Sequence, residues 1–117
     1  MPHYLSQVSY TPEAWSKLVA NPHDRIEAVR APIEKLGGQI VNAFFAFGEY
    51  DVVVITEMPN NVSAAAIAIA FAAGGAVRSE KTTPLMTTTE ALEAIRLAGT
   101  TGYRPVTAGA SAAAARP

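Results

Sequence analysis

The sequence of 117 residues contains no cysteine, and only 16% of its residues are charged. Without cysteine the chain cannot form disulfides, attack a substrate with a thiolate, or hold zinc through sulfur. It also lacks a basic block: its net charge is −1, whereas nucleic-acid-binding domains usually carry a positive stripe. No apolar run reaches the ~18 residues typical of a membrane-spanning helix. We therefore expect neither a nucleic-acid partner nor a membrane span.

Recognisable catalytic and metal-binding patterns are also missing. The only histidines, His3 and His23, are far apart in the sequence, and no His-x-x-x-His spacing occurs. No nucleophile elbow, phosphate-binding loop or dinucleotide-binding glycine pattern is present. We therefore name no catalytic residue, and we expect no metal and no cofactor. The N-terminus lacks a signal-peptide pattern, so a cytoplasmic protein is expected.

The strongest structural signal is a stretch of two apolar runs, 39–47 and 50–58, separated by Gly48-Glu49. This pattern predicts a β-hairpin, and a glycine at the first loop position favours a type II′ turn with positive φ. Phe47 would then lie opposite Tyr50. A three-residue loop would change this pairing.

This register predicts two faces. The face expected under helices carries Val41, Ala43, Phe45, Phe47, Tyr50, Val52, Val54 and Thr56. The second face is mixed, and it carries Ile40, Asn42, Phe44, Ala46, Asp51, Val53, Ile55 and Glu57. A solvent-facing sheet surface is usually polar. We therefore expect the second face to be covered, with Ile40, Phe44, Val53 and Ile55 as the interface of a homo-oligomer.

The remaining chain reads as one domain of strands and helices. A strand is expected over 3–10, a helix capped by Thr11, and a second helical segment restarted at Asn21-Pro22 and stopped at Gly37-Gly38. An alanine-rich helix follows over 62–73; it is either buried on more than one side or exposes its alanines to water. Residues 76–86 should form an edge strand, and Thr87 and Glu90 have the spacing of a capping box before a last helix.

The element order is β-α-β-β-α-β with one additional helix. It predicts an α+β, ferredoxin-like antiparallel sheet of strand order 4-1-3-2 with helices on one face. We expect a domain over 1–99 and a flexible tail, rich in alanine, glycine and proline, over 100–117. The open face of such a sheet is the surface through which dimeric α/β-barrel proteins associate.

The hairpin segment Phe47-Gly48-Glu49-Tyr50-Asp51-Val52-Val53 resembles the signature of the GYD-domain family, with Gly48, Tyr50 and Asp51 at the named positions. Further matching stretches extend the resemblance over about residues 3–98. Where the family usually has Pro-Asp-Asn, this chain has Asn60. The resemblance implies the fold of the dimeric α/β-barrel proteins and no particular activity.

Four residues are candidates for binding a small organic ligand: Asn42, Tyr50, Asp51 and Arg78. Each also has a structural interpretation. Asp51 can accept hydrogen bonds from turn amides, and Tyr50 can be a core aromatic. Arg78 can be a solvated charge on an edge strand, and Asn42 can pair across a dimer.

Two functions remain open at this point. The first is a non-catalytic oligomeric module that assembles or binds a small ligand between subunits. The alternative is a cofactor-free oxygenase or isomerase that acts on a small apolar or aromatic compound, which rests on analogy of fold.

Overall fold

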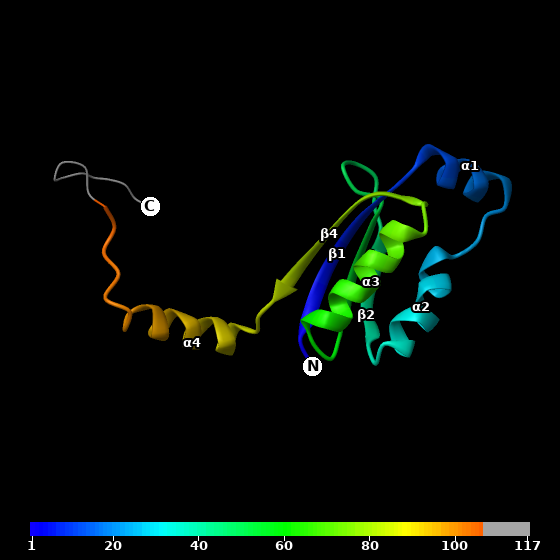
Figure 1. The fold of residues 1–117 in the computed structure, drawn as a ribbon. Helices are drawn as coiled ribbons and strands as arrows, with labels where there is room; N and C mark the ends of the chain where they lie inside the picture. Colours follow the sequence, from blue (N-terminus) through cyan, green and yellow to red (C-terminus); the bar gives the residue numbers. More distant parts are fainter. Residues whose placement is uncertain (107–117) are drawn as a thin grey trace. The chain divides into compact units, whose positions relative to one another are not determined.

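Four antiparallel strands form one sheet in the order β2-β3-β1-β4. The strands are β1 (His3–Tyr10), β2 (Gln39–Phe45), β3 (Val52–Glu57) and β4 (Val77–Leu85), and the helices between them are α1 (Pro12–Ala20), α2 (Arg25–Lys35) and α3 (Asn61–Ala73). This is the predicted 4-1-3-2 order read from the other edge. The ferredoxin-like α+β fold with one additional helix is therefore confirmed, and β4 is an edge strand as expected (Figure 1).

The computed structural model describes residues 1–106, and the chain divides into two compact units, Met1–Leu85 and Met86–Pro117. The second unit contains α4 (Thr88–Ala98), which begins with the predicted capping box between Thr87 and Glu90. The expected flexible tail, 100–117, lies largely outside the described residues. Among the residues described, no helix is both long enough and apolar enough to cross a bilayer.

Side-chain caps fix where the helices begin. Thr11 accepts a hydrogen bond from the amide of Ala14 at 3.1 Å, and Asn60 accepts one from Ser63 at 2.9 Å. The start of α2 differs from the prediction: its cap is Asp24, which accepts from the amide of Ile26 at 2.9 Å. The break between α1 and α2 therefore spans residues 21–24, and the second helix begins after Asp24 and not at Asn21-Pro22.

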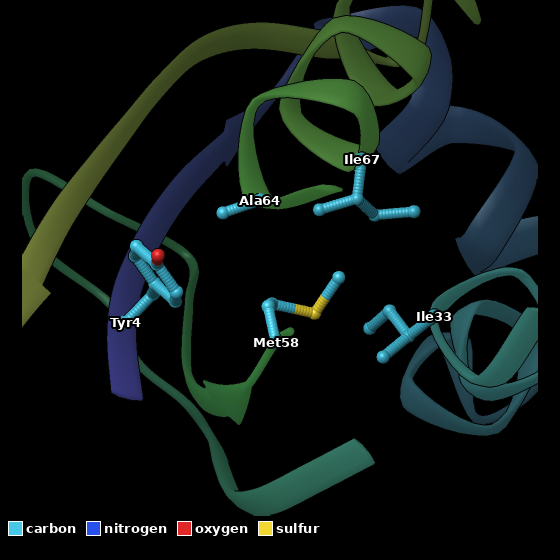
Figure 2. Close-up of a cluster of buried hydrophobic side chains, with 5 residues drawn as sticks. All are labelled: Tyr4, Ile33, Met58, Ala64 and Ile67. Atoms are coloured by element: carbon cyan, nitrogen blue, oxygen red, sulfur yellow. The ribbon is translucent and has the colours of Figure 1, made fainter. Parts of the chain in front are cut away.

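The helices α1, α2 and α3 pack on one face of the sheet (Figure 1). In one buried cluster, Tyr4 of β1 and Met58 after β3 meet Ile33 of α2 and Ala64 and Ile67 of α3 (Figure 2). A second cluster lies further along the sheet and is built from Val8, Tyr10, Val52 and Val54. Together the clusters form the core of the unit Met1–Leu85.

Within that unit α3 is buried on one side only. Its buried residues are Ala64 and Ile67, whereas Ile69 remains 67% exposed. Of the two possibilities that the sequence left open, the single chain therefore shows the one in which most alanines of α3 face outward.

The hairpin has the predicted register at its base and a different loop. Phe45 pairs with Val52 and Asn42 with Ile55, which is the register set by placing Phe47 opposite Tyr50. The strands end at Phe45 and begin again at Val52, however, and Phe47 is fully exposed, not under helices. Gly48 has a positive φ of 156°, far from the ~60° of a type II′ turn.

A register shift between Ile40 and Asn42 corrects the predicted faces of β2. A bulge adds one residue to a strand, and the residues beyond it change face. Ile40 therefore packs against both core clusters and does not lie on the second face. Val41 and Phe45, expected under helices, are exposed, because β2 is an edge strand. Phe44, Val53 and Ile55 lie on the face of the sheet opposite the helices, as predicted.

Candidate functional site

A partly enclosed cavity of about 170 Å³ lies between the sheet and the helices α2 and α3. Its lining is mostly apolar and includes Val8, Val54, Ile26, Val29, Ile67 and Phe71. Protein interiors rarely contain voids larger than a water molecule. A partly enclosed, mostly apolar space with a few polar groups on its wall is therefore a candidate binding site.

Two buried hydroxyl groups line this cavity. Ser6 of β1 and Thr56 of β3 are 7% and 4% exposed, and both project from the helix-covered face of the sheet. Within residues 1–106 neither hydroxyl makes a hydrogen bond to protein. Buried polar groups are nearly always hydrogen-bonded. These hydroxyls are therefore free to bond a molecule held in the cavity.

A phenol and a guanidinium line the cavity where α2 begins. Tyr10, at the end of β1, and Arg25, the first residue of α2, both belong to the lining. Burial raises the pKa of Tyr10 above its ordinary value, although the neighbouring Arg25 guanidinium opposes this shift. Arg25 makes no ion pair with a carboxylate in the part of the chain that the structure describes. Its charge is available to an anion.

Asp51 joins the β2–β3 loop to the neighbouring elements. One of its carboxylate oxygens accepts from the amide of Tyr10 at 2.9 Å and from Nε1 of Trp15 at 3.3 Å. Its own amide donates to the carbonyl of Val8 at 2.8 Å. The ring of Trp15 meets Tyr10 edge to face with centroids 5.5 Å apart. This geometry is that of a structural acceptor, although its contacts are with β1 and α1 and not with turn amides.

The side of the sheet opposite the helices forms the open sheet face. The strand register arranges it in three rows, each written in the order β2-β3-β1-β4: Phe44, Val53, Gln7, Lys81; Asn42, Ile55, Leu5, Thr83; and Gln39, Glu57, His3, Leu85. Its centre is apolar and consists of Leu5, Val53 and Ile55. Beside it, Phe44 is 61% exposed.

The other candidate ligand residues are not brought together. Asn42 is exposed on β2 and Arg78 is exposed on β4, and these strands are the two opposite edges of the sheet. Three strand spacings, roughly 14 Å, separate them across the sheet, and Arg78 also lies five residues along β4 from Thr83, which is in the row of Asn42. Tyr50 is half-buried in the loop beside Asp51. No common site of Asn42, Tyr50, Asp51 and Arg78 is formed.

Sequence reasoning missed the polar residues of the cavity: Ser6, Tyr10, Arg25 and Thr56. One signal was available, because the alternation of β1 places Ser6 on the same face as the buried Tyr4 and Val8. A small polar residue between core positions indicates either a partner or a space beside it. The sequence gives no corresponding signal for Arg25, whose position depends on where α2 lies over the sheet.

Residues 4–95 match the family model described as GYD domain. No curated protein matches the chain.

Proposed function

Because the chain belongs to the GYD-domain family and its sheet leaves one apolar face open, we propose that it is a non-catalytic module that assembles with copies of itself. The assembly is a dimer, or a set of dimers, in which two open sheet faces stack in the manner of a dimeric α/β barrel. The observation that carries the proposal is the exposure of Phe44 beside Leu5, Val53 and Ile55.

The layout of this face supports a role as an interface. Phe44, Val53, Ile55 and Leu5 form a diagonal apolar band across the face. Gln7 and Lys81 lie on one side of the band, and on the other side lies a His3–Glu57 pair, with Nε2 to carboxylate oxygen at 3.4 Å. An apolar core with a polar rim is the usual anatomy of a protein interface. Large exposed apolar patches on a soluble chain mark interaction sites.

The area of the face limits how the dimer forms. Four strands about 4.8 Å apart, with about seven residues at about 3.3 Å each, give a flat area on the order of 400 Å². A standard interface buries ~800 Å² per partner. Face-to-face stacking therefore provides the centre of the interface, and segments that flank the sheet complete it.

A pair of neighbouring phenylalanines on β2 tests the proposal. Phe44 and Phe45 are 61% and 51% exposed but lie on opposite faces, since Phe44 pairs with Val53 and Phe45 with the buried Val52. Phe44→Glu places a charge in the proposed interface, whereas Phe45→Glu makes the same chemical change on the other face. We expect Phe44→Glu to weaken self-association at least 100-fold and Phe45→Glu to leave it nearly unchanged, as measured by analytical ultracentrifugation.

The same experiment can contradict the proposal. An intact oligomer in Phe44→Glu, together with a folded circular dichroism spectrum, would place the interface elsewhere. Dissociation by Phe45→Glu alone would assign it to the other face of β2. If no monomer is stable, Phe44→Glu will instead lower the melting temperature in a concentration-dependent manner.

The cavity favours a second candidate function, a cofactor-free oxygenase or isomerase that acts on a small apolar or aromatic compound. Burial raises the pKa of Tyr10 above its ordinary value, so the phenol keeps its proton at neutral pH and can donate a hydrogen bond to a substrate oxygen but cannot act as a base. The carboxylate of Asp51 is bonded to Tyr10 and Trp15 and is not among the cavity-lining residues. Oxygen uptake or isomer formation that disappears in Tyr10→Phe would favour this candidate over the non-catalytic module.

A further inference from the structure

The cavity has polar groups at two ends and an apolar middle. Tyr10 and Arg25 lie at one end, and Ser6 and Thr56 line it further along the same strands. Tyr10 lies four positions after Ser6 on β1, a distance of about 13 Å along the backbone. The apolar side chains of Val8, Val54 and Ile67 lie along this path or above it.

We propose that this cavity binds a small carboxylic acid that carries a hydroxyl group at its far end, such as a hydroxy-substituted aromatic acid. The carboxylate binds Arg25, the apolar body fills the space under α2 and α3, and the hydroxyl bonds to Ser6 and Thr56. This site is separate from the open sheet face and does not depend on assembly.

The volume is suitable for one small ring. An engineered cavity of about 150 Å³ lined by aliphatic and aromatic side chains binds benzene. The present cavity, about 170 Å³, has room for a ring. Because the cavity is only partly enclosed, polar substituents can extend toward its ends.

The charges around the cavity favour an anion. Arg25 is half-buried, and within residues 1–106 no carboxylate lies in ion-pair distance of it. Asp24, which precedes it, uses its carboxylate to cap α2. Asp51 faces the backbone amide of Tyr10 and the indole of Trp15. An arginine next to an apolar cavity matches a carboxylate, which it can bind through two parallel hydrogen bonds.

The hydroxyl groups of Ser6 and Thr56 are the reason why we expect the ligand to carry a hydroxyl at the end far from its carboxylate. A ligand hydroxyl can donate to one of Ser6 and Thr56 and accept from the other, since each side chain can do both. It would satisfy two groups that are otherwise buried without a partner in the described chain. A site built to hydrogen-bond a hydroxyl discriminates against the analogue that lacks it.

The test uses 4-hydroxybenzoate as the probe and the full chain as the protein, with affinities from isothermal titration calorimetry and locations from amide NMR shifts. We expect a dissociation constant of about 1 mM or below for 4-hydroxybenzoate, given the ligand's size. Benzoate, which lacks the hydroxyl, and 4-hydroxybenzamide, which lacks the charge, should each bind at least fivefold more weakly.

Two conservative variants locate the ends of the ligand. Arg25→Gln should remove the preference for 4-hydroxybenzoate over 4-hydroxybenzamide and leave the affinity for the amide unchanged. Thr56→Val should remove the preference for 4-hydroxybenzoate over benzoate and leave the affinity for benzoate unchanged. Thr83→Val, on the open sheet face, is the matched control and should change neither preference.

The last test fills the cavity with a larger side chain of the protein itself. Val54→Phe, or Val29→Phe if the first variant does not fold, should abolish binding of all three compounds. The proposal is overturned if 4-hydroxybenzoate does not bind at 10 mM, if it binds no better than its two analogues, or if binding persists in a folded, cavity-filled variant.

Discussion

Gly38 shows how closely the backbone of this chain approaches its own core. A Cβ added at Gly38 would lie 2.6 Å from the carbonyl oxygen of Glu57 and would collide with the sulfur of Met58. Met58 is fully buried and belongs to the core cluster under α3. The glycine pair at 37–38, which the sequence suggests as a helix stop, thus also allows β2 to pass beside the end of β3.

This close approach predicts that one methyl group added at Gly38 destabilises the fold. Gly38→Ala should destabilise the fold by about 1–3 kcal/mol, the usual cost of overpacking. Gly74→Ala is the matched control, since Gly74 has helical dihedrals and its nearest obstacle is 3.5 Å away. It should be neutral or stabilise by up to about 1 kcal/mol. Urea unfolding measures both changes, and equal effects of the two variants would refute the close contact.

Tyr10 predicts how stability responds to alkaline pH. Burial raises its pKa above the ordinary value of 10.0, so the folded chain keeps the phenol proton where the unfolded chain has released it. The contribution of this group is therefore fully present below about pH 10 and is lost as pH rises through the folded-state pKa. One proton changes the free energy of unfolding by at most about 1.4 kcal/mol per pH unit.

The variant Tyr10→Phe isolates this contribution. Wild-type stability should decline more steeply between pH 10 and pH 11 than that of Tyr10→Phe, as measured by urea unfolding across the range. At pH 7 to 9 the difference between the two proteins should be constant. Parallel declines above pH 10 would show that the Tyr10 phenol ionises normally in the folded protein.

At the level of single elements, β2 shows what a sequence pattern can and cannot determine. The pairing of Phe44 with Val53 follows from the loop position, because two strands joined by a short loop have a fixed register. The bulge near Val41 does not follow. Ile40 and Val41 are both apolar, so either residue could satisfy the core, and the local alternation contains no information that separates them.

The helix α3 also shows what the sequence determines and what it does not. Asn60 predicts where α3 begins, because its side chain can cap the first free amides. Alanines on every side of the helix do not predict which side is buried. That choice depends on where the helix lies over the sheet, and it places Ala64 and Ile67 inward and Ile69 outward.

At the scale of the whole unit Met1–Leu85, fold and cavity differ in how far they follow from the sequence. Strand order and the helix-covered face depend on connection lengths and apolar alternation, which are local properties. The cavity depends on the gap left between three elements. Ala70 and Ala76 line the cavity with small side chains. The sequence shows that these residues are small, but it does not show that the packed helices leave a space beside them.

Two surfaces of this unit therefore have separate roles in the account. The open sheet face points away from the helices, and we propose that it binds a second copy of the chain. The cavity lies under α2 and α3, and we propose that it binds a small organic acid. A variant that dissociates the assembly through Phe44 should leave the residues of the cavity unchanged, since the two surfaces share no residue.

The central claim is self-association through the open sheet face, and the mass of the wild-type protein in solution tests it most directly. Sedimentation velocity over a range from about 1 to 100 µM separates monomer from dimer without immobilisation or labels. We predict a species of twice the chain mass of 12.3 kDa, or an even multiple of it, across this range. A single species of 12.3 kDa at every concentration would contradict the account.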